Sequence, residues 1–303
     1  MEIIDAITGS FLLSVIAVPA ALSLVVMLLN KHHTETSKLA LQNSLATIGL
    51  TIVNVFALWA LMPTVNRTAN GLYSAVGIPS LPSSFWDSTP WWLITPIIFV
   101  VLDLCDYAIH RLMHRKWFWP THAAHHSDTH VNAFTAYRVH FLELMLMSIS
   151  YLVLATWLQL PGLLPVALLI NRVWLGYVHM DLPWDHGRLR YIIASPVYHR
   201  WHHADTPAAH GKNLANKFPF IDLLFGTFYD AKVSDVTSVP MGATASNISD
   251  VNVFKLASYP AAQWLRLLRS QAQKLSGRTP PPPQQEAAPG LSSVLAGAPE
   301  TLD

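Results

Sequence analysis

Long apolar segments alternate with short polar ones over the first 180 residues. A helix of about 20 apolar residues crosses the roughly 30 Å hydrocarbon core of a bilayer. Segments of about this length lie at 3–29, 39–62, 92–110, 141–158 and 163–179. Only Gln159-Leu-Pro-Gly162 separates the last two, so they form either a tight helical hairpin or a re-entrant pair. The pattern predicts an all-α integral membrane bundle of about four or five transmembrane helices.

The first apolar segment could be mistaken for a secretory signal. However, the chain starts with Glu2 and Asp5 rather than with basic residues, and no convincing small-residue cleavage site follows the segment. We therefore interpret residues 3–29 as a retained span.

Basic residues predict which side of the membrane each polar segment occupies. Two lie in 31–38, four in 111–139 and eleven after His179, whereas the connector 63–90 carries only Arg67. Because basic loops favour the cytoplasm, this asymmetry places the N-terminus outside and the polar segments after 110 in the cytoplasm. The short chain without a fused cytochrome domain or a dilysine tail favours a bacterial plasma membrane over the endoplasmic reticulum.

Composition agrees with a membrane protein. The chain is 52% hydrophobic and 12% charged, against about 25% charged residues in soluble proteins. Its net charge of +1 gives no indication of nucleic-acid binding. Cys105 is the single cysteine, which excludes a disulfide framework, a zinc ribbon or a thiolate iron–sulfur site within one chain.

Histidine is unusually frequent, with 15 residues, and most of the polar chemistry lies in three clusters. The clusters are His110-Arg-Leu-Met-His114, His122-Ala-Ala-His125-His126 and His199-Arg-Trp-His202-His203. Residues three and four apart share a helix face, so each cluster can aim several imidazoles in one direction. One such pair would suit a merely solvated histidine, but three clusters on one side of the membrane favour metal binding. Eight ligands exceed the four of one tetrahedral zinc and predict two metal ions, although imidazole alone suits Zn, Cu, Fe and Ni.

Two acidic residues precede the first cluster on the same helix face. Asp103 and Asp106 continue the three-to-four spacing of His110 and His114. A carboxylate at the end of a span is costly unless it has a partner, which marks it as a candidate functional group. We expect Asp103 or Asp106 to accept a ring N–H from a ligating histidine and so to assist catalysis. The alternative is an ordinary ion pair with a nearby arginine.

The motifs resemble those of the fatty acid hydroxylase/sterol desaturase superfamily over residues 95–230. The matching stretches are Asp103-Leu-Cys-Asp-Tyr-Ala-Ile-His110-Arg111, the three histidine clusters, Arg138-Val-His-Phe-Leu-Glu143 and Asp222-Leu-Leu-Phe-Gly-Thr227. The step of eight residues from His114 to His122 favours this superfamily over acyl-CoA desaturases.

The resemblance implies a non-haem di-iron centre on the cytoplasmic face that uses O2 and electrons from a separate ferredoxin, rubredoxin or cytochrome-type protein. It implies as iron ligands the eight clustered histidines together with His179, at the end of the fifth span. The family pattern has a histidine four residues further on, where this chain has Pro183. A tenth ligand would therefore be His186 or His140.

The expected activity is hydroxylation of a lipid alkyl chain or sterol-like substrate that enters from the bilayer. Desaturation begins with the same hydrogen abstraction and stays open as an alternative. A metal transporter would need polar ligands near the middle of its spans, where this chain has almost none. A membrane zinc hydrolase is a further alternative.

We expect four regions along the chain. Residues 1–90 would hold the first spans and a connector, and 91–240 the catalytic domain. Residues 241–278 would hold a C-terminal helix, amphipathic over Phe254 to Leu275, that rests on the membrane surface or serves as a plain cap. The Pro-rich segment 279–303 would be a disordered tail.

Overall fold

The computed structural model describes residues 38–159, 164–248 and 251–276, together with positions 17, 20–22, 24, 25 and 28. The predicted first span, 3–29, and the tail 279–303 lie largely or wholly outside the described residues. Within them the fold is all-helical, as expected, and the one β-type contact is an isolated bridge between Ala204 and Met241. The chain divides into two compact units, Met1–Ala262 and Gln263–Asp303, with the boundary inside the last helix.

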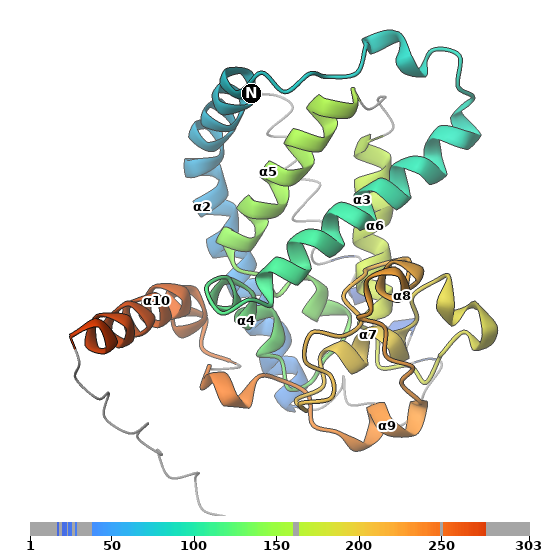
Figure 1. Cartoon of the computed structure of the whole chain (residues 1–303). Coiled ribbons are helices and arrows are strands. Elements are labelled where there is room, and N and C mark those ends of the chain that lie inside the picture. The colour runs from blue at the N-terminus through green and yellow to red at the C-terminus, as the bar shows by residue number, and fades with distance from the viewer. Residues whose placement is uncertain are drawn as a thin grey trace, which may run out of the picture. The chain divides into compact units, whose positions relative to one another are not determined.

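In the first unit most of the short helices form a layer at one end of the long helices (Figure 1). The long ones are α2 (Lys38–Val76), α3 (Trp91–Met113), α5 (Phe141–Leu158) and α6 (Leu164–Val178). The short ones are η2 (Ser83–Trp86), α4 (Trp119–His126), η3 (Ala133–Tyr137), η4 (Gly187–Tyr191), α7 (Pro196–His202), α8 (Phe220–Phe225), α9 (Val233–Ser238) and η5 (Thr244–Ser246). The last helix, α10 (Val253–Leu275), continues into the second unit.

Three of the long helices, α2, α3 and α5, are long and apolar enough to cross a membrane. This finding confirms the prediction of a helical membrane bundle. The fourth, α6, has 15 residues, or about 22 Å of helix, which is shorter than the hydrocarbon core. Whether the last two apolar segments form a hairpin or a re-entrant pair, and how many segments cross the membrane, stay predictions.

Helix α2 differs from the prediction of a span ending at Met62. It continues through Pro63 to Val76, and Gly77, with φ of +69°, follows its last residue. Proline removes only one hydrogen bond from the ladder, and here it lies on an exposed stretch of the helix. The prediction that a non-helical connector starts at residue 63 was wrong.

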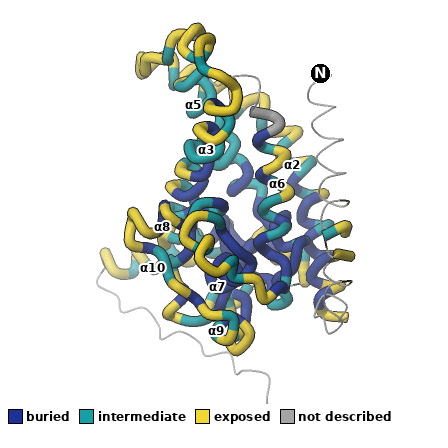
Figure 2. The backbone as a smooth tube through the Cα atoms, turned by 90° about the vertical axis from the view of Figure 1, so that its right-hand side faces the viewer, coloured by how far each residue is buried: buried dark blue, intermediate teal, exposed yellow. Residues whose placement is uncertain are grey.

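The length of α2 indicates that only part of it crosses the membrane. Its 39 residues extend about 58 Å, nearly twice the hydrocarbon thickness. All of its buried residues lie between Ala40 and Asn54, and the rest of the helix is exposed or half-buried (Figure 2). The N-terminal half of α2 therefore packs against the rest of the protein, and the apolar stretch 45–62 overlaps this buried part.

Hydrogen bonds align the ends of the spans. The Leu81 N–H donates to the carbonyl of Trp157 at 2.8 Å, and the Trp86 indole N–H to that of Leu158 at 2.8 Å. These contacts place the 77–90 connector beside the C-terminal end of α5. The other ends of α3, α5 and α6 therefore face the layer of short helices, in agreement with the predicted gathering of basic segments on one side.

Arg138 joins this layer to α2. Its side chain is fully buried, and it donates to the Ala124 carbonyl, the Ser127 hydroxyl and the Asn43 carbonyl at 2.9–3.2 Å. A buried guanidinium is tolerated only when acceptors surround it in this way. One residue on, the Val139 carbonyl accepts from the Asn54 amide at 2.7 Å. The segment before α5 is therefore fixed to both α4 and α2.

We expect Arg138→Met to lower the free energy of unfolding by about 2–4 kcal/mol, since it leaves buried carbonyls without a donor. Thermal unfolding of the full chain in detergent would measure the loss. Arg67→Met is the matched control because Arg67 is exposed and bonds only to Thr64 on its own helix. Equal midpoints for the two variants would show that Arg138 does not support the layer.

Candidate metal centre

All nine histidines predicted as metal ligands lie in two groups at the ends of the spans. Within each group the candidate ligand atoms are within 4.8 Å of one another. The first group consists of His110, His114, His122, His126 and His202, and the second of His125, His179, His199 and His203. Every member except the half-buried His114 is buried.

The two groups share helices, because each HxxHH cluster divides its side chains between them. On α4, His122 and His126 are four residues apart and belong to the first group, whereas His125 belongs to the second. The third cluster does the reverse: His199 and His203 join the second group and His202 the first. Side chains four apart lie on one helix face, and the residue between them points to another. The groups are therefore neighbours, with the His126 and His203 rings stacked at 4.5 Å between centroids.

Distances between ring nitrogens match those between ligands of one ion. The Nε2 atom of His179 lies 3.3 Å from that of His125, 3.0 Å from that of His199 and 3.2 Å from that of His203. Ligands held about 2.1 Å from an ion are about 3.0 Å apart in an octahedron and about 3.4 Å apart in a tetrahedron. The second group thus has the spacing of one coordination polyhedron.

Backbone carbonyls fix the tautomers of three of these histidines. Each Nδ1–H donates to a carbonyl: His110 to Leu214 at 2.7 Å, His179 to Leu175 at 2.6 Å and His202 to Lys212 at 2.8 Å. With the proton on Nδ1, the lone pair of Nε2 points into the group. Such outer hydrogen bonds orient metal-binding imidazoles and make them more basic.

Glu143 serves the same purpose for a fourth histidine. Its carboxylate lies 3.1 Å from Nδ1 of His122, and the side chain of Glu143 is buried in the first turn of α5. The sequence motif included Glu143, but our prediction gave it no role. A carboxylate at the start of an otherwise apolar span was the available signal.

Burial keeps the imidazoles neutral. Loss of solvation lowers the pKa of His179 to about 3 and holds the pKa values of His125, His199 and His203 well below 6.5. Neutral imidazole is the form that binds a metal ion. The ring nitrogens of His114, His126 and His202 that face the first group are buried and make no hydrogen bond within the protein. The donor set therefore fits metal ions in both groups.

Asp103 and Asp106 lie beside the centre, but neither accepts a hydrogen bond from a histidine ring among the described residues. Asp103 instead accepts the backbone N–H groups of residues 216–218 and pairs with Lys217 at 3.4 Å. Asp106 accepts from the Tyr151 hydroxyl and lies 3.6 Å from Lys217. The expected direct contact with a ligand was wrong, because the two carboxylates are occupied by the backbone of residues 216–218, by Tyr151 and by Lys217. The alternative pairing with Arg111 or Arg115 is not seen either.

The role of Asp103, together with that of Asp222, is to hold the loop that orients two ligands. Asp222 accepts the N–H groups of Leu214 and Ala215, both at 2.8 Å, and also the Tyr198 and Thr227 hydroxyls. Together with Asp103 it fixes residues 214–218, next to the Leu214 carbonyl on which His110 depends. We therefore assign Asp103 and Asp222 to positioning rather than to catalysis.

Neither residue considered as a tenth ligand belongs to the groups. His140 caps α5, where its Nδ1 accepts from the Leu142 N–H while Nε2 lies 2.9 Å from the Ala257 carbonyl. His186 lies 2.6 Å from the Tyr177 hydroxyl and 3.2 Å from the Ile193 carbonyl. Both rings have their nitrogens occupied elsewhere.

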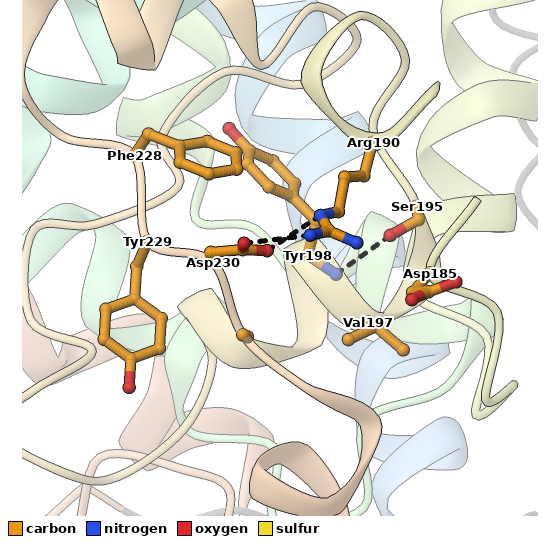
Figure 3. A pocket seen from close by; sticks show the side chains of 9 residues that line it. Asp185, Arg190, Ser195, Val197, Tyr198, Phe228, Tyr229 and Asp230 are labelled. Atoms are coloured by element: carbon orange, nitrogen blue, oxygen red, sulfur yellow. Dashed lines mark hydrogen bonds and ion pairs between the residues drawn. The ribbon is translucent and has the colours of Figure 1, made fainter. Parts of the chain in front are cut away.

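Cavities on the surface do not coincide with the histidine groups. One beside α7 measures about 10 Å³, room for about one water, and is closed by the ion pair of Arg190 and Asp230 at 2.9 Å (Figure 3). A larger recess of about 280 Å³ is lined by Asp181, Arg200 and residues of α9. Chemistry in this region therefore depends on the buried groups themselves.

Comparisons with known proteins agree with the geometry. Residues 95–227 match the family described as "Fatty acid hydroxylase". Over 145 residues, 47% of this chain, the sequence is 33% identical to an alkylglycerol monooxygenase of Danio rerio. It is 31% identical over 156 residues, 50% of this chain, to an ornithine lipid hydroxylase of Rhizobium tropici. A methylsterol monooxygenase of Arabidopsis thaliana is 26% identical over 141 residues, 43% of this chain.

These relatives are longer than the region they share with this chain. The match covers 31%, 46% and 46% of their respective lengths. No solved structure matches the chain.

We expect the wild-type chain to bind two metal ions, and His199→Ala to bind about one, because it removes a ligand from the second group only. Metal content after anaerobic loading with Fe²⁺ would measure this. His130→Ala is the control, since His130 lies outside both groups. A wild-type content of one ion, or equal contents for all three proteins, would contradict the two-group arrangement.

Glu143→Gln should weaken metal binding about 10- to 100-fold, because it removes the charge that holds the His122 ring in place. Competition with a chelator would give the affinity. Asp235→Asn, on α9 and far along the chain from any ligand, should leave it unchanged. An unaltered affinity in Glu143→Gln would mean that the carboxylate is not needed to orient His122.

Proposed function

We propose that this chain, whose residues 95–227 match the fatty acid hydroxylase family, is a membrane hydroxylase that uses O2 to oxidise a C–H bond of a lipid. One observation carries the proposal: two adjacent groups of buried, neutral histidines lie where the apolar helices end. All ligand atoms are ring nitrogens, a donor set suited to a redox-active ion such as iron. The region 91–240 is the catalytic domain in this proposal.

Two iron ions are the expected metals, one in each group. Such a pair, when bound and reduced, supplies the oxygen activation and the hydrogen abstraction that hydroxylation needs. The protein contributes geometry: the carbonyls of Leu214, Leu175 and Lys212 hold three rings in one tautomer, and the Glu143 carboxylate lies 3.1 Å from a fourth. Because the rings are held before any ion binds, little reorganisation is needed during the reaction.

The surroundings of the centre fit a lipid substrate. On the membrane side, Ile94, Ile98 and Leu102 of α3 pack with Ala167 of α6 in an apolar cluster. His110 follows two turns after Leu102 on the same helix. An alkyl chain that enters between the spans would therefore pass apolar side chains before it reaches the polar residues around the histidines. The relatives named after alkylglycerol, ornithine lipid and methylsterol support a lipid as the substrate class.

Electrons would come from a separate protein. The single cysteine cannot build a rubredoxin or ferredoxin site, and the short helices that surround the histidines form the side where the basic segments gather. By the positive-inside rule we assign this side to the cytoplasm. A soluble ferredoxin, rubredoxin or cytochrome-type donor could reach the centre there.

Oxygen-dependent product formation tests the proposal. We expect Fe²⁺-loaded protein with O2 and a reductant to convert a membrane lipid extract into products that contain one additional oxygen atom, labelled when ¹⁸O2 is supplied. His125→Ala, which breaks the second group, should reduce turnover by at least about 100-fold. Mass spectrometry separates this outcome from desaturation, in which two hydrogens are lost. Activity that persists without O2 would favour a hydrolase, and the proposal would fail.

A further inference from the structure

Two buried polar side chains near the centre make no side-chain hydrogen bond with any described residue. They are Tyr137, at the end of η3, and Asn171, in the middle of α6, which are 2% and 5% exposed. The Tyr137 hydroxyl and the Asn171 carbonyl oxygen have no hydrogen-bond partner among the described residues. Leaving such groups buried and unpaired costs free energy, so a native structure needs a reason to keep them.

Other buried amides in the bundle do not share this property. Asn43 and Asn54 also have an unpaired oxygen, but each donates its amide nitrogen to a carbonyl, Leu39 in one case and Val139 in the other. Both therefore already contribute to the contacts of α2. Tyr137 and Asn171 contribute no such contact, which indicates that folding alone does not require their polar atoms.

Both side chains are linked to the second histidine group through Leu175. Tyr137 packs against Leu175, whose carbonyl accepts the Nδ1–H of His179 at 2.6 Å. Asn171 lies one helical turn before Leu175, and Ala167, one turn earlier, belongs to the apolar cluster between α3 and α6. Along α6, Ala167 of the apolar cluster is therefore followed one turn later by Asn171, and then by Leu175 and the candidate ligand His179.

Their chemistry is complementary. Burial raises the pKa of Tyr137 to about 12, so the phenol keeps its proton and can donate it. The free atom of Asn171 is a carbonyl oxygen, an acceptor. Only a group that both accepts and donates satisfies the two together, as a hydroxyl does. An ether, an ester or a carboxylate would leave the Asn171 oxygen unpaired.

We propose that Tyr137 and Asn171 form a binding site for a hydroxyl group of the lipid substrate, and so place the neighbouring alkyl chain at the second histidine group. The proposal deepens the proposed function, since it names a substrate class for the same centre: a lipid with a hydroxyl close to the carbon that is oxidised. A site that binds a substrate hydroxyl discriminates strongly against analogues without one, because its own polar groups are then left unpaired.

Photolabelling of the full-length, metal-free chain tests this site without turnover. The probes are hexadecanol and its methyl ether, each with a diazirine in the chain. We expect the alcohol to label wild-type protein at roughly tenfold lower concentration than the ether. Tyr137→Phe and Asn171→Leu should each remove this preference, while Tyr73→Phe, whose hydroxyl contacts only Ser80 outside the bundle, should retain it.

The outcomes separate this inference from the proposed function. Equal labelling of wild-type protein by alcohol and ether overturns the hydroxyl site, even if lipid is hydroxylated. A preference that survives in both variants overturns it as well. A preference lost in both variants supports the site, even if no oxygen-dependent product is found. Because the wild-type comparison needs no variant, a misfolded variant does not remove the test.

Discussion

The structure depends on nine neutral imidazoles, eight of them buried and His114 half-buried, that lie close together. Each has to lose its hydration, and their ring nitrogens approach to about 3 Å. Hydrogen bonds to the outer nitrogens lower the cost of this burial, and a cation that faces the inner lone pairs would offset it further. The carbonyls of Leu175, Lys212 and Leu214 hydrogen-bond the outer nitrogens of three rings, and the Glu143 carboxylate lies beside that of a fourth. The inner nitrogens make the arrangement a candidate metal centre.

The buried acids follow from this requirement. A loop whose carbonyls orient histidines has to keep its own backbone fixed, and irregular backbone is held only by added partners. Asp103 and Asp222 between them accept the five N–H groups of residues 214–218, and the Lys217 ammonium balances the charge near Asp103 and Asp106. Arg138 does the same for the turn before α5. Charge inside this protein therefore serves to position backbone around the histidines.

The membrane helices supply a scaffold and an apolar approach. The buried residues of α2 lie in the half of the helix that packs against the rest of the protein, and this explains why polar residues such as Asn43, Thr47 and Asn54 recur in a helix of high hydropathy. In α6 the pattern is similar: Asn171 interrupts an apolar segment close to His179. Polar side chains inside these helices thus concentrate near the centre, where metal or substrate can use them.

The sequence by itself determined the helical class, the apolar segments and the nine histidines, because periodicity and residue chemistry are local properties. It also indicated that the histidines share one side of the membrane, through the basic residues that flank the spans. It did not determine which histidine belongs to which group, since that depends on how α4 and α7 face each other. Nor did it predict that α2 continues past Pro63, or that Asp103 binds a loop more than a hundred residues away. Those features come from contacts between distant segments, and only the tertiary structure decides whether a buried acid meets a ring nitrogen or a backbone N–H.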